Sequence, residues 1–289
     1  MRELKGRINS VYSSQKITGA MKMISSARLR KAENRLLQAE PYRRQLWEIF
    51  AHIEADGGEF RSPWTEQREC KKVAIVVFAT DDGLCGAFNI SLYKKLQEMV
   101  QAYQRKGIHD ITVCPVGRKI FPDVRRMKGI RLTACPAAFE RKEYVAGTRE
   151  MTAEWMNGFW EGRYDRVEVI YTHYKSVGTQ IVQHRQFLPV ELADSERPEH
   201  GKVAPWFIYE PDCESILKML FPLMLHALMY EMLLESKASE QAVRILTMQL
   251  AYDNSVKLLE KLQLEYNKLR QQGITSELLD IAGGSNRKS

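Results

Sequence analysis

Proline is absent from both ends of this 289-residue chain. Residues 1–40 and 223–289 contain none, and eight of the ten prolines lie between Pro63 and Pro211. Because proline breaks helix interiors and collects in turns and loops, this distribution predicts a long helix at each end and a compact domain between them. The expected ranges are 1–58 for the N-terminal helix, 70–210 for the middle domain and 212–283 for the C-terminal helix.

Recognisable cysteine and histidine motifs are also lacking. The five cysteines are widely spaced and form no CxxC pair, and the six histidines form no HExxH. This usage indicates a reducing compartment and argues against a disulfide framework or a zinc site. A GxSxG elbow is missing as well. We therefore expect no metal, no cofactor and no catalytic residues in this chain.

No hydrophobic run is long enough to span a bilayer. The most apolar stretch, Met219–Tyr230, has twelve residues and contains Pro222 and His226, whereas a membrane-spanning helix needs about 20. The N-terminus shows no signal-peptide or transit-peptide pattern. Membrane insertion is not expected.

Excess positive charge is confined to the N-terminal segment. Residues 1–50 hold eleven Lys or Arg and four acidic residues, which accounts for the whole net charge of +7. A basic helix of this kind contacts an acidic partner, nucleic acid or an anionic membrane, or it is simply a solvated face. Composition alone leaves these interpretations open.

A heptad seam runs along the N-terminal helix, but it becomes polar in the middle. Apolar or small residues at seam positions extend from Leu4 to Val11 and from Leu29 to Ala39, with the alternating spacing of a coiled coil. A second apolar stripe lies about 100° around the helix, and the sequence does not decide whether that stripe faces inward or outward. The polar seam positions are Gln15, Thr18, Lys22 and Ser25, and the second stripe is Ile17, Met21 and Ile24.

The C-terminal segment carries a matching seam. Asp212 is the expected N-cap and Ala282–Gly284 the expected stop. A continuous helix between them would measure on the order of 100 Å, too long to be buried in a domain of this size. We expect it to pair with the N-terminal helix as a long antiparallel coiled coil. Its seam positions are Ile245, Met248, Tyr252, Ser255, Leu259, Leu262, Tyr266, Leu269 and Gly273.

The middle of the chain alternates strands and helices. Such alternation favours a doubly wound, Rossmann-like α/β domain, so the fold class is α/β with this domain inserted between the paired helices. The last strand, Ile181–Val190, is expected at an edge. The other predicted strands are Val73–Thr80, Ile111–Gly117 and Val167–Tyr174, and the predicted helices include 90–107 and 149–163.

The loop "TDDGLCGAFN" follows the first strand, where open α/β sheets bind ligands. It matches neither the dinucleotide fingerprint nor the P-loop, and the adjacent Asp81 and Asp82 would repel a phosphate. Gly83 and Gly86 are explained by a tight turn, and Cys85 by a buried thiol.

Several long motifs occur in the order typical of one family. They are "QKITGAMKMISSARLRKAE", "TDDGLCGAFN", "YEPD", "SKASEQAVRILTMQLAYDNS" and "LQLEYNKLRQQGITSELLDIAGG". Nearly end to end, the chain resembles the γ subunit of the F-type ATP synthase. The resemblance implies a non-catalytic rotor: paired terminal helices form a shaft inside a ring of alpha and beta subunits, and the α/β domain forms a foot held with the epsilon subunit on the c ring. Membrane association is then peripheral and through the complex, on the cytoplasmic face of a bacterial plasma membrane, with no nucleic-acid partner.

The resemblance also implies which residues contact partners. Contacts with beta-subunit loops carry over to two motifs, and contacts with the c ring and epsilon subunit to a third. The beta contacts are Met21, Lys22, Met23, Arg270, Gln271 and Thr275, and the foot contacts are Phe207, Tyr209 and Glu210.

The chain departs from the family pattern in places. Asp82 stands where the family usually has Arg, which changes the expected partner of this loop, and Tyr12 replaces a usual polar residue. The cysteine insertion of chloroplast members is absent, so thiol regulation of that kind is not expected. Two other functions are kept as alternatives: a nucleic-acid-binding coiled coil, based on the basic N-terminal segment, and a nucleotide-dependent enzyme built on the α/β domain.

Overall fold

A computed structural model describes residues 2–55, 64–190 and 208–285 of the chain. Its contacts divide the chain into two compact units. One unit comprises residues 1–27 and 244–289; we call its two described helical segments the shaft pair. The other comprises residues 28–243 and contains the whole β-sheet; we call it the sheet unit.

The sheet has five strands in the order β3-β2-β1-β4-β5. β1 pairs in parallel with β2 and β4, β2 pairs in parallel with β3, and β4 pairs antiparallel with the edge strand β5. The strand order reverses between β1 and β4, the point at which such sheets usually bind ligands. The strands are β1 (Lys72–Phe78), β2 (Asp110–Val116), β3 (Arg131–Leu132), β4 (Arg166–Ser176) and β5 (Thr179–Leu188).

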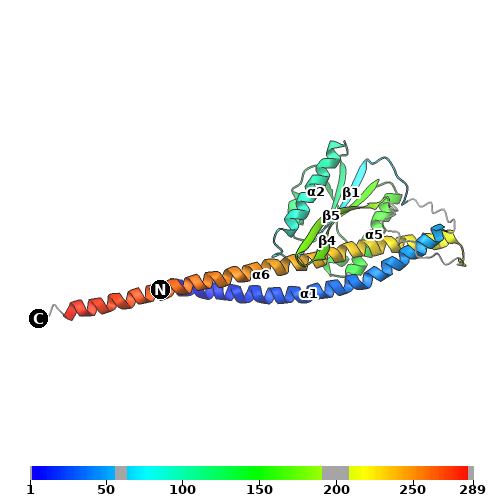
Figure 1. The fold of residues 1–289 in the computed structure, drawn as a ribbon. Coiled ribbons are helices and arrows are strands. Elements are labelled where there is room, and N and C mark those ends of the chain that lie inside the picture. The colour runs from blue at the N-terminus through cyan, green and yellow to red at the C-terminus, as the bar shows by residue number, and fades with distance from the viewer. Residues whose placement is uncertain (1, 56–63, 191–207, 286–289) are drawn as a thin grey trace. The chain divides into compact units, whose positions relative to one another are not determined.

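Helices cover both faces of this sheet (Figure 1). On one face, α2 (Phe88–Arg105) packs on alternate β1 residues such as Ile75. On the other, α5 (Tyr144–Trp160) and parts of the two terminal helices pack around Val76 and Phe78. Because β1 is buried on both faces, it reads as a continuous apolar run. Two short helices, α3 (Phe121–Arg125) and α4 (Ala137–Glu140), complete the unit.

The expected strands and helices of the middle domain are confirmed with small shifts at their ends. The predicted edge strand is also confirmed, and the structure shows that it pairs antiparallel with β4. β3 was not predicted, because its two residues are exposed and give no alternation signal. Gly117, which follows β2 with φ of +116°, brings the chain close to Ala79: an added Cβ would lie 2.7 Å from the Ala79 carbonyl. Any side chain there would therefore clash with backbone.

The terminal helices are α1 (Arg2–Ala55) and α6 (Cys213–Ser285). Asp212 caps α6 as expected, since its Oδ1 accepts a hydrogen bond from the Ser215 amide at 2.8 Å, and this bond lowers the pKa of the Asp212 carboxyl. Each helix continues through one internal proline, Pro41 or Pro222. α6 also continues one residue past the expected stop, a difference ordinary for helix ends.

α6 is the one described helix that is long and apolar enough to cross a membrane by length and composition. Half of its most apolar window is buried within the protein, and core helices of soluble proteins satisfy the same criteria. This finding is therefore weak evidence for membrane insertion.

The shaft pair is an antiparallel coiled coil. Lys22 of α1 donates a hydrogen bond to Gln249 of α6, and Gly19 of α1 lies against the Tyr252 ring of α6. Residue numbers along α1 therefore decrease as those of the contacting residues on α6 increase, so the two helices run antiparallel. The α6 seam is confirmed from Ile245 to Tyr266, where every seam position is buried or half-buried.

The polar middle of the α1 seam faces the partner helix. Gln15, Thr18 and Lys22 are half-buried and Ser25 is 2% exposed. Ile17 and Ile24 are 59% and 54% exposed. α1 thus keeps one seam throughout. Of its second apolar stripe, Ile17 and Ile24 face outward, whereas Met21 is half-buried.

Candidate functional site

α6 lies across the carboxyl edge of the sheet, at the point where the strand order reverses. Ser236 Oγ donates a hydrogen bond to the carbonyl of Phe78, the last residue of β1, at 3.0 Å. Ser239 Oγ donates to the Thr172 carbonyl of β4, also at 3.0 Å. Both serines are buried. The crevice that binds ligands in related sheets is therefore filled by a helix of the same chain.

Lys237 lies between these serines and joins α6 to the loop after β1. Its ammonium group is 3.2 Å from Glu240 and 3.7 Å from Asp81, and it lies 5.6 Å from the centre of the Tyr144 ring. Burial by itself lowers the pKa of Lys237, but the negative charges of Glu240 and Asp81, together with Tyr144, raise it above the usual value. Lys237 is accordingly a cation with only 17% of its side chain exposed, neutralised by two carboxylates.

Asp82 of the same loop faces Arg28 of α1. The carboxylate and guanidinium are 3.8 Å apart, and both side chains are more than half exposed. An exposed pair of this kind contributes little to stability.

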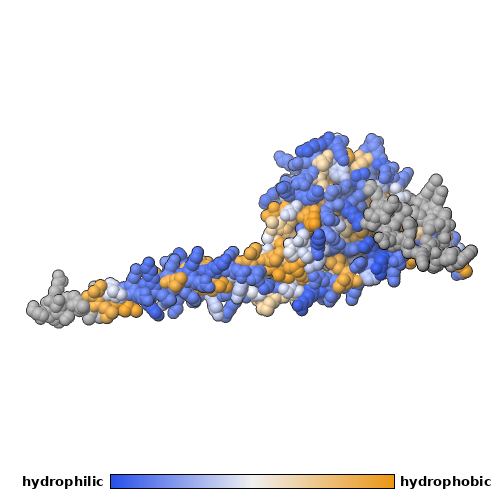
Figure 2. Space-filling model, in the orientation of Figure 1, coloured by the Kyte–Doolittle hydropathy of each residue, from blue (hydrophilic) through white to orange (hydrophobic). Residues whose placement is uncertain are grey.

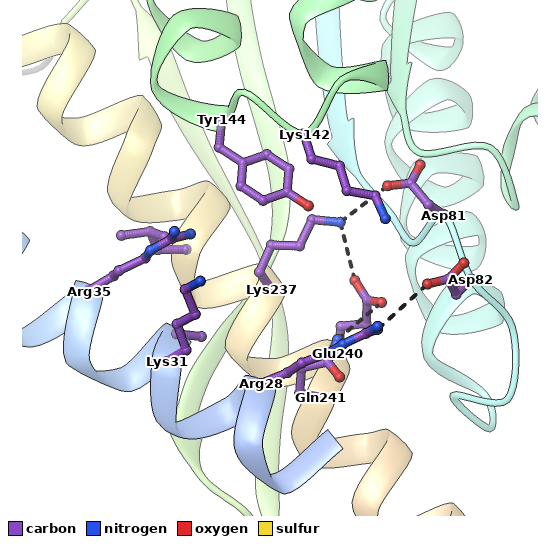
Figure 3. A pocket seen from close by; sticks show the side chains of 12 residues that line it. Arg28, Lys31, Arg35, Asp81, Asp82, Lys142, Tyr144, Lys237, Glu240 and Gln241 are labelled. Carbon is purple, nitrogen blue, oxygen red and sulfur yellow. Dashed lines mark hydrogen bonds and ion pairs between the residues drawn. The ribbon is translucent and has the colours of Figure 1, made fainter. Parts of the chain in front are cut away.

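A cavity of about 370 Å³ opens beside Lys237 (Figure 3). We call it the basic cavity. Side chains from α1, α6, the loop after β1, the segment between α4 and α5, and the first residue of α5 surround it, and Figure 3 shows them converging. Its charged lining comprises the cations Arg28, Lys31, Arg35, Lys142 and Lys237 and the acids Asp81, Asp82 and Glu240.

Metal and thiol chemistry find little support at this edge. Within residues 2–55, 64–190 and 208–285, no group of three His, Cys, Asp or Glu side chains could hold a metal ion. Cys85 is buried, and its Sγ is 3.7 Å from the Asn89 amide. This placement agrees with a structural thiol.

The predicted beta-contact residues of α1 differ in their exposure to solvent. Met23 is 69% exposed, whereas Met21 and Lys22 are half-buried. Lys22 is turned toward α6, where it meets Gln249. Apolar groups nevertheless reach solvent beside them, and Figure 2 shows orange patches among the blue polar surface along the shaft pair.

The predicted contact residues of α6 lie elsewhere on the shaft pair. Arg270, Gln271 and Thr275 are exposed, and Thr275 bonds the Gln271 carbonyl of its own helix. The pairing of Lys22 with Gln249 places Arg270 near the first residue of α1, roughly 30 Å along the helix from Met23. The structure therefore does not bring the two groups together.

Of the three foot residues, Tyr209 is half-buried against the apolar cluster around Val76 and Phe78, and Glu210 is exposed. Phe207 lies outside the described residues.

Sequence reasoning missed the side chains that fasten α6 to the sheet. Ser236 and Ser239 are three residues apart with the buried Ala238 between them, and small polar residues at this spacing inside an apolar helix could have indicated a docking face. Lys142 and Tyr144 gave no signal, because they come next to the basic cavity only through the tertiary fold.

Comparison with known proteins gives a consistent result. Residues 1–286 match the protein family described as ATP synthase. The chain is 39% identical to the ATP synthase gamma chain of Parabacteroides distasonis, covering 99% of this chain and 98% of the relative. It is 34% identical to that of Heliobacterium modesticaldum with the same coverage. Among solved structures, a chain of the Euglena gracilis mitochondrial ATP synthase assembly containing OSCP, F1 and the c ring is similar in fold, with a TM-score of 0.63 and 16% identity, covering 99% of this chain and 93% of that one.

Proposed function

Since this chain belongs to the family of ATP synthase gamma chains, we propose that it is the central-stalk rotor subunit of an F-type ATP synthase. The observation that carries the proposal is the outward stripe of the shaft pair. Ile17 and Ile24 are each more than half exposed on one side of the helix, whereas the inner seam of this helix holds polar residues. Exposed apolar side chains in a row mark a surface that another protein covers.

In this proposal the shaft pair turns inside a ring of alternating alpha and beta subunits. Rotation presents different faces of the shaft to each beta subunit, and a face that binds one beta conformation more tightly than another shifts that subunit toward it. Met21, Lys22 and Met23 contact beta loops near the middle of the shaft pair. Arg270, Gln271 and Thr275 contact a beta loop farther along α6, where Arg270 offers its guanidinium donors to acidic groups.

The sheet unit is the foot of the rotor. Phe207, Tyr209 and Glu210 are assigned to contacts with the epsilon subunit and the c ring, which ion flow turns. The chain then reaches the membrane only through the complex, on the cytoplasmic face of a bacterial plasma membrane. It contributes no catalytic residues of its own, and its effect on catalysis is conformational.

Reconstitution tests the proposal. The chain is mixed with alpha and beta subunits of a close relative, and the assembled complex is purified and assayed for ATP hydrolysis. We expect one copy of this chain in each ring and activity that depends on it. Failure of the chain to enter the complex would refute the proposal.

A pair of matched variants tests the outward stripe. Ile17→Gln combined with Ile24→Gln is expected to leave the fold intact, because both side chains are exposed, and to weaken rotor-dependent hydrolysis severalfold. Ile90→Gln is the control, since Ile90 is 69% exposed on α2 in the sheet unit. Equal activity in the double variant and the control would contradict the assignment of this stripe to the ring.

A further inference from the structure

The basic cavity has more positive charge than its own carboxylates neutralise. Asp81 and Glu240 both lie near Lys237, and Asp82 lies near Arg28. The three remaining cations of the lining belong to two separate elements. In the part of the chain that the structure describes, none of the three side chains has a hydrogen-bond or ion-pair partner; they are those of Lys31, Arg35 and Lys142.

The hydroxyl group of Tyr144 can act as a further hydrogen-bond donor in the same cavity. The Tyr144 ring lines the cavity over Lys237, and its hydroxyl forms no hydrogen bond with any described residue. Burial raises the pKa of Tyr144, so the hydroxyl keeps its proton at neutral pH and can donate it to an oxyanion. Figure 3 shows Tyr144 and Lys142 reaching into the cavity opposite Lys31 and Arg35.

The backbone at Lys142 provides an independent observation. α4 ends in a Schellman motif, in which the Lys142 amide bonds the Phe139 carbonyl and the Glu143 amide bonds the Ala138 carbonyl. Lys142 occupies the left-handed position of this motif, with φ of +62°, where glycine is usual. The fold thus tolerates backbone strain at a residue whose side chain enters the cavity, and such strain is common at ligand sites.

We propose that the basic cavity binds a small phosphate-bearing anion, held by Lys31, Arg35 and Lys142 with the Tyr144 hydroxyl as a further donor. A phosphate group carries the multiple charge and the several acceptor oxygens that this set of donors requires, whereas one carboxylate would neutralise only one of the three cations. The cavity volume lies within the range of small-molecule sites, about 300–1,000 Å³. This site is separate from the surfaces used in the proposed rotor function, so the two proposals fail independently.

Equilibrium dialysis of the dilute full-length chain tests this proposal. Radiolabelled inorganic phosphate, pyrophosphate, ADP and ATP are compared at constant ionic strength, which separates a free phosphate from a nucleotide as the source of the group. We expect saturable binding of one equivalent of at least one of these anions. Arg35→Gln and Lys142→Gly are each expected to weaken that binding at least tenfold.

Lys142→Gly is informative because glycine suits the left-handed backbone, so loss of binding in this variant cannot be ascribed to misfolding. Lys94→Gln is the matched control, since Lys94 is an exposed lysine of α2 outside the cavity lining, and it should bind like the parent chain. The proposal is overturned if no anion binds saturably, if all three variants bind alike, or if a hexaglutamate peptide binds while every phosphate compound fails.

Discussion

At the residue scale, a few polar side chains of α6 attach this helix to the β-sheet and to the loop after β1. Ser236 and Ser239 donate hydrogen bonds to main-chain carbonyls of the parallel strands β1 and β4, and Lys237 lies between the carboxylates of Asp81 and Glu240. A buried polar group stabilises a fold only while its partner is present. The docking of α6 onto the sheet should therefore be sensitive to single substitutions here.

Replacing Lys237 tests this sensitivity. Lys237→Met keeps the length of the side chain but removes the positive charge between Asp81 and Glu240. We expect the free energy of unfolding to fall by about 3 kcal/mol, as for breaking a buried ion pair, measured by urea denaturation. Adding Asp81→Asn should restore part of the loss, and a cost below about 1 kcal/mol would contradict the role given to Lys237.

The same interaction has a defined pH dependence. The pKa of Lys237 is raised in the folded protein above its reference value of 10.5, so its contribution is fully present below that value and is lost as the pH rises through the folded pKa. The stability difference between the parent chain and Lys237→Met should therefore be constant from about pH 7 to 9 and shrink near pH 11. A difference that grows in alkali would show that the pKa is lowered instead.

At the element scale, the sequence pattern located the seams of the terminal helices but did not show which side of α1 faces its partner helix. Burial confirms the α1 seam and the α6 seam as far as Tyr266, whereas Leu269, a later predicted seam position, is exposed. The spacing could not decide the direction of Ile17 and Ile24, because two stripes 100° apart are equivalent until the position of the partner helix is known. Gln15, Thr18 and Lys22 take the inner positions although they are the more polar set.

A lysine at a seam position lowers the stability of a coiled coil relative to an apolar residue. Substitution of Lys22 can measure the size of this effect. Lys22→Met removes a charge from a half-buried seam position, and we expect it to raise the stability of the helical chain by about 0.5–1 kcal/mol. The readout is the midpoint of thermal unfolding by circular dichroism at 222 nm. Lys257→Met is the control, since Lys257 is exposed on α6 outside the seam; an equal rise there would refute the seam interpretation.

The attachment of α6 to the sheet can be weakened without changing any charge. Ser236→Ala and Ser239→Ala each leave a strand carbonyl without its hydroxyl donor, and each should cost about 1–2 kcal/mol in urea unfolding. Ser255→Ala is the matched control, because the Ser255 hydroxyl bonds only the Ala251 carbonyl of its own helix. We expect the control to change stability by less than about 0.5 kcal/mol, and similar costs at all three serines would argue against a docking role.

At the scale of the whole molecule, the order of the elements was predictable and their tertiary associations were not. Periodicity identified the buried strands and the long helices, because these patterns are local. It could not reveal that residues 28–55 and 213–243 belong to the compact unit that holds the sheet. It also could not bring Lys31, Lys142 and Lys237 to one cavity, since they are far apart in the chain.

The free chain is expected to associate with itself. Large apolar side chains of the shaft pair remain exposed, including Leu250 at 64% and Leu264 at 70%, and association would cover them. Leu250→Lys combined with Leu264→Lys should shift light scattering of the free chain toward the monomer. Leu84→Lys, at a 56% exposed leucine of the sheet unit, is the control and should change the scattering little; a parent chain that is monomeric at high concentration would contradict the expectation.

The attachment of α6 to the carboxyl edge of the sheet through Ser236 and Ser239 has one further consequence. α6 behaves there as a tethered ligand: it occupies the crevice from within the same polypeptide, at the high effective concentration that a covalent link provides. A dissolved nucleotide would have to compete with a segment that cannot diffuse away. The crevice thus holds a permanently attached helix of the same chain instead of a dissociable ligand, and its role is to connect the sheet to α6.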